Sequence, residues 1–294
     1  MRVFVTGATG FIGSAVVPDL ISAGHQVIGL SRSDAGAQAL TKAGAQVHHG
    51  DLENLESLRS GAAKADGVVH IAFIHDLSKF KENCEIDRRA IETLGEALAG
   101  SDRPLVVSGG LFPTPGRTTT EDDAPPANSP TPRVSEETAL ALAARGVRAS
   151  VIRLPQVHDT AKQGFITYMI AIARQTGVSA YIGDGLNRFP AVHLSDTAPL
   201  YRLALEKAPA AARYHAVAEE GVAAREIAEA IGRGLGVPAV SIPAAESHGH
   251  FGWLGMFMGM NLAASSALTQ KRLAWHPTGP GLISDLDHMD YSKP

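Results

Sequence analysis

The chain has 294 residues, a net charge of −4 and a sequence pI near 6.3, and it contains no cluster of Lys and Arg suited to a phosphate backbone. Hydrophobic residues make up 45% of it and charged residues 19%, which supplies enough apolar surface for a folded core. These values exclude a wholly disordered chain and argue against nucleic acid as a partner.

Cysteine content and hydropathy narrow the cellular setting. Cys84 is the only cysteine, so no internal disulfide and no cysteine-based metal site can form, and a reducing compartment, the cytoplasm, is expected. No stretch reaches the roughly 18 to 20 apolar residues that span a bilayer. The first apolar run, Val3 to Val5, is soon interrupted by glycines. We therefore expect no membrane partner, no signal peptide and no metal.

Short apolar runs alternate with helical patterns along the first half of the chain. Strands are expected at Arg2–Thr6, Gln26–Leu30, Gln46–His49, Gly67–Ala72, Pro104–Ser108 and Ala149–Leu154, with helices at Phe11–Ala23, Ala35–Ala43, Glu82–Ala99 and Val134–Ala144. Parallel strands need long crossovers, and helices supply them. This order predicts an α/β fold with a Rossmann-type, doubly wound parallel sheet.

The second half is less regular. Gly109–Pro132, rich in Pro, Thr and Gly, is expected to be a long loop beside the site. Residues 1–155 are expected to form a dinucleotide-binding domain to which 190–217 return. Residues 156–189 and 218–294 are expected to form a smaller C-terminal substrate lobe, with a helix at Arg225–Leu235 and a strand at Val240–Ile242.

Three glycines at the first turn carry the strongest motif. Gly7, Gly10 and Gly13 form G-x-x-G-x-x-G between the first expected strand and the first helix, and Thr9, Phe11 and Ile12 lie in the same turn. Glycine allows close approach of the backbone to a diphosphate, whose charge is favoured at a helix N-terminus. The alternative is a connecting turn without a ligand. Because strand, turn and helix agree, we predict a dinucleotide site.

The residues after the second strand bear on the choice of dinucleotide. An acidic residue at this position binds the free ribose hydroxyls of NAD, but here the chain reads Ser31, Arg32 and Ser33. A guanidinium suits the 2′-phosphate of NADP, and the two serines add hydroxyl donors. We therefore predict NADP as the cofactor, the alternative being an ordinary solvated arginine.

Two further strand ends complete the predicted cofactor site. Asp51 and Leu52 follow the third strand, where a carboxylate accepts the adenine amino group and an apolar side chain covers the ring. Asp51 equally suits the cap of a helix that begins near Leu55. Ala72 and Phe73 follow the fourth strand, where a small residue leaves room for the ribose next to nicotinamide.

A family resemblance follows from these segments taken together. VTGATGFIGSAVVPDL, HGDLENLESL, VVHIAF, VVSGG, ASVIRLPQVH and FPAVHLSDTAPLYRLALE, in this order, resemble the extended short-chain dehydrogenase/reductase family, including its epimerase/dehydratase branch. The resemblance covers Met1 to about Val217. It implies a Rossmann sheet, a bound nicotinamide dinucleotide and a C-terminal substrate lobe, and it implies that Pro155 and Val157 lie near the nicotinamide.

The usual catalytic pair of that family is missing. Its chemistry needs a Tyr with a Lys four residues later, and no Tyr here has a Lys at that spacing; Arg133 and Glu137 stand in the two places. An arginine with a pKa above about 12 cannot act as a general acid, although it can bind an anion. Ser108 and His158 are the other catalytic candidates, and a hydrogen-bonded structural histidine is the alternative for His158.

Three functions remain open at this point. The apolar segment His248–Met260, with Tyr168, Met169 and Tyr181, is expected to wall a pocket for a flat hydrophobic substrate, unless it packs into the core or a dimer contact. We predict an atypical NADPH-dependent ketoreductase acting on a ketone or quinone-type carbonyl. The alternatives are a catalytically inactive NADP-binding sensor and a nucleotide-sugar epimerase or dehydratase. A monomer and a homodimer are both compatible with the sequence.

Overall fold

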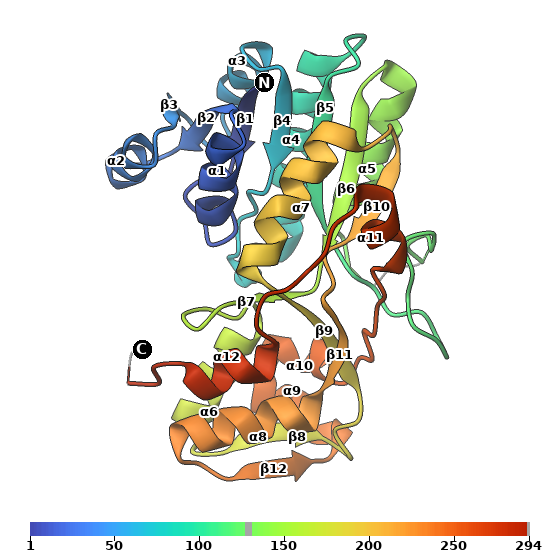
Figure 1. Cartoon of the computed structure of the whole chain (residues 1–294). Coiled ribbons are helices and arrows are strands. Elements are labelled where there is room, and N and C mark those ends of the chain that lie inside the picture. The colour runs from blue at the N-terminus through green and yellow to red at the C-terminus, as the bar shows by residue number, and fades with distance from the viewer. Residues whose placement is uncertain (127–130, 293–294) are drawn as a thin grey trace.

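The central sheet has seven parallel strands, as the sequence predicts (Figure 1). The computed structural model describes residues 1–126 and 131–292. The strand order is β10-β6-β5-β4-β1-β2-β3. The strands span β1 Arg2–Thr6, β2 Gln26–Ser31, β3 Gln46–His49, β4 Gly67–His70, β5 Pro104–Gly110, β6 Arg148–Leu154 and β10 Ala212–His215. No helix in these described ranges is long and apolar enough to cross a membrane.

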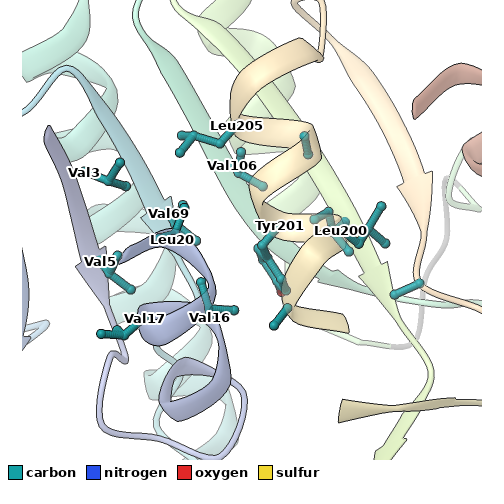
Figure 2. Packing of buried hydrophobic residues seen from close by; sticks show 14 of the residues in the cluster. Val3, Val5, Val16, Val17, Leu20, Val69, Val106, Leu200, Tyr201 and Leu205 are labelled. Atoms are coloured by element: carbon teal, nitrogen blue, oxygen red, sulfur yellow. The ribbon is translucent and has the colours of Figure 1, made fainter. Parts of the chain in front are cut away.

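Helices cover both faces of this sheet, which explains why its inner strands, such as β1 and β4, are mostly apolar. The helices of this half are α1 Gly13–Ser22, α2 Asp34–Lys42, α3 Leu55–Ala63, α4 Phe80–Leu98, α5 Ser135–Ala141 and α7 Leu194–Lys207. Figure 2 shows α1 and α7 on one face, with Val16 of α1 and Tyr201 of α7 turned toward the buried strands. Helices α3, α4 and α5 enclose a second apolar layer on the other face.

The sheet reverses its winding direction at β1, which lies between β2 and β4. Ligands of doubly wound folds bind outside the carboxyl ends of the strands at such a point. The turn after β1 here touches the loop after β4, since a Cβ on Gly7 would lie 2.7 Å from the backbone nitrogen of Ala72. This contact defines the floor of the crevice that holds the candidate site.

The lower half of Figure 1 is a separate layer of small sheets and helices. A three-stranded sheet has the order β11-β9-β7, and β12 pairs with β8. The elements are β7 Gln156–His158, α6 Ile166–Thr176, β8 Ser179–Ile182, β9 Arg188–His193, β11 Glu219–Ala223, α8 Ala224–Leu235, β12 Ala239–Ile242, α9 Ser247–Phe251, α10 Gly255–Met258 and α12 Leu282–His288. Residues 166 to 286 supply its apolar core.

The C-terminal segment is shared between the two halves, whereas the sequence assigned all of 218–294 to the lobe. Helix α11 (Ala267–Leu273) packs beside β10 and α7, and Leu273 and Trp275 join the core of the central sheet. The Trp275 indole donates a hydrogen bond to the backbone oxygen of Asp196 at 2.9 Å. Helix α12 packs against α8 in the lobe. The remaining domain boundaries stay predictions.

The long loop after β5 has no helix or strand in its described residues, 111–126 and 131–134, as expected; residues 127–130 lie outside the described part. It is nevertheless fastened to the C-terminal segment. Thr119 donates its backbone N–H to Ala263 and accepts one from Ser265, both at 2.9 Å. The buried Glu121 carboxylate accepts hydrogen bonds from the backbone and hydroxyl of Thr269 at 2.6 and 2.7 Å. The loop is thus an ordered part of the wall.

A fully buried arginine holds this loop, β6 and α5 together. The guanidinium of Arg153 donates two hydrogen bonds to Glu136, at 2.7 and 2.6 Å, and a third to the backbone oxygen of Asp123. Burial opposes ionisation of Glu136, but Arg153 and Arg213 outweigh it and hold the pKa of this carboxyl below its ordinary value. The buried arginine is therefore neutralised and hydrogen-bonded.

His215 completes this cluster in its neutral form. Its Nε2 lies 3.1 Å from Nη1 of Arg153, which only donates, so Nε2 accepts and the proton sits on Nδ1, 2.7 Å from the backbone oxygen of Ser265. Burial is the main reason that the pKa of His215 is lowered. Protonation would place a second cation against the guanidinium.

We expect His215 to make folding sensitive to acid. The unfolded chain takes up a proton at this residue near pH 6.5, whereas the folded chain resists it to lower pH, so the unfolded state binds more protons in between and stability falls as pH drops. The free energy of unfolding of the parent protein should fall by about 1 to 2 kcal/mol more between roughly pH 7 and pH 5 than that of His215→Asn, measured by urea titration. The exposed His49→Asn variant is the control, and a parent-like pH slope in His215→Asn would contradict the assignment.

Candidate active site and cofactor crevice

The glycine-rich turn leaves backbone donors pointing out of the sheet. Gly7 has a positive φ of 69°, and the N–H of Gly10 bonds to its carbonyl at 2.9 Å. A Cβ on Gly13 would lie 2.0 Å from the same carbonyl oxygen, so only glycine fits there. The N–H groups of Phe11 and Ile12 have no acceptor among the described residues. A tight turn with free donors at the start of α1 fits a diphosphate.

The end of β2 places three polar side chains beside this turn. Arg32 is exposed and has no ion pair or hydrogen bond with any described residue. Ser31 is buried and donates its hydroxyl to the backbone oxygen of Ser33, so this proton is not free for a ligand. Ser33 caps α2 by accepting from the N–H of Gly36, which leaves its own hydroxyl hydrogen available. Arg32 and Ser33 are therefore the accessible donors of the predicted set.

Asp51 has a local structural task after β3. Its Oδ1 accepts the backbone N–H groups of Glu53 and Asn54, both at 2.9 Å, and Asn54 is the residue that caps α3. Asp51 is therefore not the helix cap itself. It holds the turn that positions Asn54, which is the cap of α3. Leu52 is buried against the core beneath. A contact of either residue with adenine stays a prediction.

Arg133 lies across the ends of β4 and β5, and its correspondence to the Tyr of the usual pair stays a prediction. Its guanidinium stacks over the Phe73 ring at 4.4 Å and donates to the backbone oxygen of Ser108 at 3.1 Å. No carboxylate among the described residues pairs with it. Glu137, the residue predicted to stand for the Lys, is exposed on α5. Hydrogen bonds and the Phe73 ring therefore hold a cation at the ends of β4 and β5.

A chain of buried polar side chains fixes Arg133 from behind, and the sequence analysis missed it. Nε of Arg133 donates to Ser135 at 2.8 Å, and Ser135 in turn donates to Oδ2 of Asp87. His70, at the end of β4, lies 3.1 Å from Oδ1 of Asp87 and 2.7 Å from the hydroxyl of Thr6. Burial disfavours the Asp87 anion, but His70, Arg133 and Ser135 keep the pKa of this carboxyl below its ordinary value.

Ser108, a predicted catalytic residue, has both of its hydrogen-bonding roles filled. Its hydroxyl donates to the backbone oxygen of His70 at 3.1 Å and so accepts from the hydroxyl of Tyr201, 2.7 Å away. Tyr201 is fully buried on α7, and burial raises the pKa of its hydroxyl. A catalytic role for Ser108 stays a prediction, and it requires one of these bonds to open.

His158 is inaccessible in this structure. Its side chain is 0% exposed, and Nδ1 lies 2.7 Å from Asp285 of α12. Nε2 is buried without a hydrogen-bond partner among the described residues and lies 4.0 Å from Glu219. Burial outweighs the Asp285 charge and lowers the pKa of His158, which favours the neutral ring. It anchors α12 to β7, and its role as a proton donor stays a prediction.

Pro155 and Val157 border the crevice at the start of the lobe. Val157 is 5% exposed and packs with the core of the central sheet, whereas Pro155 is half-buried. The residues therefore lie where β6 passes into β7, between the two halves. Their predicted contact with the nicotinamide stays a prediction.

Of the segment predicted to wall a substrate pocket, Phe251, Leu254 and Met258 pack into the core of the lobe, which is the alternative, whereas a group of aromatic side chains beside them is exposed. Phe165, Tyr168 and Trp253 are each more than a third exposed, and the Trp253 ring lies 5.8 Å from Phe165 and 5.3 Å from Tyr168. Phe257 stacks on Phe165 at 5.5 Å, and Met169 lies directly beneath. We call Phe165, Tyr168, Trp253 and Phe257 the aromatic patch. Tyr181, also predicted in the wall, lies under Arg225 instead.

Comparison with known proteins gives the family. The model of the NAD dependent epimerase/dehydratase family matches residues 3–217. The chain belongs to this family. The predicted resemblance to the extended short-chain dehydrogenase/reductases is thereby confirmed, and the family's name gives the cofactor class as a nicotinamide dinucleotide.

One relative matches nearly the whole length of this family member, and another matches a short part of it. Uncharacterized protein C2A9.02 of Schizosaccharomyces pombe is 47% identical over 290 residues, which are 97% of this chain and 98% of that protein. The 4-hydroxy-2-methyl-3-oxo-4-farnesyl-3,4-dihydroquinoline-1-oxide ketoreductase of Stigmatella aurantiaca is 40% identical over 72 residues, only 24% of this chain and 22% of that protein. The first similarity covers both halves of the fold.

Solved structures agree with the fold of this family member. The UDP-glucose 4-epimerase of Thermus thermophilus, in complex with NAD, matches with a TM-score of 0.76 and 20% identity. The match covers 100% of this chain and 99% of that one. At 20% identity this match shows only that the fold is shared, and the shared fold includes the small lobe.

We expect the buried, hydrogen-bonded side chains behind Arg133, namely Ser135, Asp87 and His70, to contribute to the stability of the fold. Asp87→Asn removes the charge that accepts from His70 and Ser135, so the free energy of unfolding should fall by about 2 kcal/mol in urea titration at neutral pH. Glu82→Gln, on the exposed side of the same helix, should change it by less than about 0.5 kcal/mol. Equal effects of the two substitutions on the free energy of unfolding would show that these hydrogen-bonded side chains contribute no specific stability.

Proposed function

We propose that the protein is an NADPH-dependent reductase of a carbonyl group, a ketone or a quinone, in a hydrophobic small molecule. The observation that carries the cofactor choice is the unpaired guanidinium of Arg32 beside the Ser33 hydroxyl, at the end of β2. A cation without a carboxylate partner is suited to the additional phosphate of NADP. The nearest acid along the chain, Asp34, lies in the first turn of α2.

The residues of the crevice fit this chemistry. When bound, the reduced dinucleotide supplies a hydride. Gly7, Gly10 and Gly13 let the backbone approach it, and Phe73 with Arg133 borders the place of the substrate carbonyl. The guanidinium donates hydrogen bonds to the oxygen as negative charge grows there, without giving up its proton. Water then supplies the proton, so no Tyr is required.

The aromatic patch supports a hydrophobic substrate. Its rings offer a broad apolar surface on the lobe, and Phe165 follows the segment that faces the glycine-rich turn. A ring system placed against such a surface excludes water from the carbonyl. The short similarity to a ketoreductase of a farnesylated quinoline supports the same substrate type.

A sensor without turnover is the second candidate, and one observation favours it. The hydroxyl of Ser108 and the ring of His158 are both engaged and shielded, and Arg133 cannot act as an acid. An epimerase or dehydratase ranks below both, because its proton-transfer cycle depends on the missing pair.

We expect Arg32 to determine the cofactor preference. Arg32→Ala should raise the Kd of NADPH roughly 10- to 100-fold, because a charge-assisted contact with the 2′-phosphate is lost, and should change the Kd of NADH less than about threefold. Nucleotide fluorescence titration measures both constants. Lys42→Ala, at the other end of α2, is the control. Equal affinities of the parent protein for the two cofactors would refute the NADP assignment.

Turnover distinguishes the reductase from the sensor. With NADPH and a panel of hydrophobic aldehydes, ketones and quinones, we expect loss of the reduced-nicotinamide absorbance with at least one compound, at a rate that falls roughly tenfold or more in Arg133→Ala. Arg133→Lys keeps the charge but not the planar fork and should recover part of the rate. Tight NADPH binding without turnover on any compound would favour the sensor.

A further inference from the structure

One lysine of the lobe reaches across the crevice to the glycine-rich turn. Lys162 lies in the segment between β7 and α6, and its Nζ is 5.7 Å from the centre of the Phe11 ring. Phe11 belongs to the glycine-rich turn, and its backbone N–H has no acceptor among the described residues. The amine therefore stands at the cofactor site although it belongs to the other half of the molecule.

The backbone around this lysine is fixed by local hydrogen bonds. Oδ1 of Asp159 accepts the N–H groups of Ala161 and Lys162, both at 2.7 Å, and Asp159 donates its own N–H to the carbonyl of Lys162 at 2.9 Å. The buried Gln163 side chain donates to the carbonyl of Asp159 at 2.7 Å. Such a closed turn presents the side chain of Lys162 from a defined position.

The ammonium group of Lys162 has no carboxylate partner. None of the ion pairs among the described residues includes it, and its side chain is exposed over an apolar ring. Partial burial and the charges of Arg133 and Lys162 lower the pKa of His75, which follows β4. Cations from two separate segments thus converge on the crevice, and neither is paired with an acid in the described part of the chain.

Resting on the proposed function, we infer that Lys162 binds the diphosphate of the cofactor from the lobe side, opposite the backbone N–H groups of the glycine-rich turn. The inference adds a binding residue outside the nucleotide-binding half. The diphosphate carries charge that the N–H groups of Phe11 and Ile12 only partly offset, and an unpaired ammonium on the facing wall complements it.

The position of Lys162 couples cofactor binding to the placement of the lobe. Its turn directly follows β7, where His158 is held by Asp285 of α12. A charge contact from this turn to the diphosphate therefore joins the two halves through the ligand. We expect bound dinucleotide to stabilise the lobe as well as the central sheet.

Two ligands separate this contact from that of Arg32. NADPH carries both the diphosphate and the 2′-phosphate, whereas adenosine 2′-monophosphate lacks both phosphates of the diphosphate and the nicotinamide half. Lys162→Ala should raise the Kd of NADPH roughly five- to twentyfold at low salt and leave the Kd of adenosine 2′-monophosphate within about twofold. Arg32→Ala should weaken both ligands. Lys162→Arg should retain NADPH binding, and Lys271→Ala on α11 is the matched control.

The outcomes distinguish failure of this inference from failure of the proposed function. If the parent protein binds neither ligand, the proposed dinucleotide site itself is refuted. If it binds NADPH and Lys162→Ala binds it equally well, or loses both ligands to the same extent, the diphosphate contact is refuted. A selective loss of NADPH that shrinks as salt is raised, with an unchanged thermal unfolding midpoint, supports it.

Discussion

The close contact between the turn after β1 and the loop after β4 governs the rest of the site. Gly7 and Gly13 have no room for a side chain, and Thr6 links the two strands through His70. Because the backbones touch, free N–H groups and the polar side chains behind β4 face one crevice. The buried line from His70 through Asp87 to Arg133 begins at this contact, so a displacement of either loop would also move the guanidinium.

Local sequence patterns predicted the strands of the nucleotide-binding half but missed most strands of the lobe. Most strands of the central sheet are buried and apolar, and the exposed edge strand β3 follows a clear helix and turn, so β1 to β6 were predicted within a few residues. The lobe strands β7, β8, β9 and β11 were not predicted, because they have only three to six residues and polar residues such as Gln156, Arg188 and His193 interrupt their apolar pattern. The sharing of the C-terminal segment depends on contacts such as that of Trp275 with α7, which no local pattern encodes.

The same distinction applies to the site. The glycine spacing and the Ser31–Ser33 segment are local signals that could be predicted from the sequence. The chain behind Arg133 joins residues 48 positions apart, Asp87 and Ser135, and its members look like ordinary helix residues. His158 stood out by its place in the RLPQVH segment, but burial against Asp285, 127 positions away, was not visible in the sequence. The groups that were predicted lie close together in the sequence, whereas the contacts that were missed join residues far apart in it.

The C-terminal segment contacts both halves of the fold, so its late place in the sequence affects the order in which the two halves are completed. Thr269 of α11 donates to Oε1 of the buried Glu121 in the nucleotide-binding half, while Asp285 of α12 bonds to Nδ1 of the buried His158 in the lobe. These two elements leave the ribosome after every other helix and strand described here. Although the early domains of many proteins fold during synthesis, each half of this one receives a hydrogen-bond partner for a buried group only from these late helices. A nascent chain that lacks residues 263–288 therefore has no partner yet for Oε1 of Glu121 or for Nδ1 of His158.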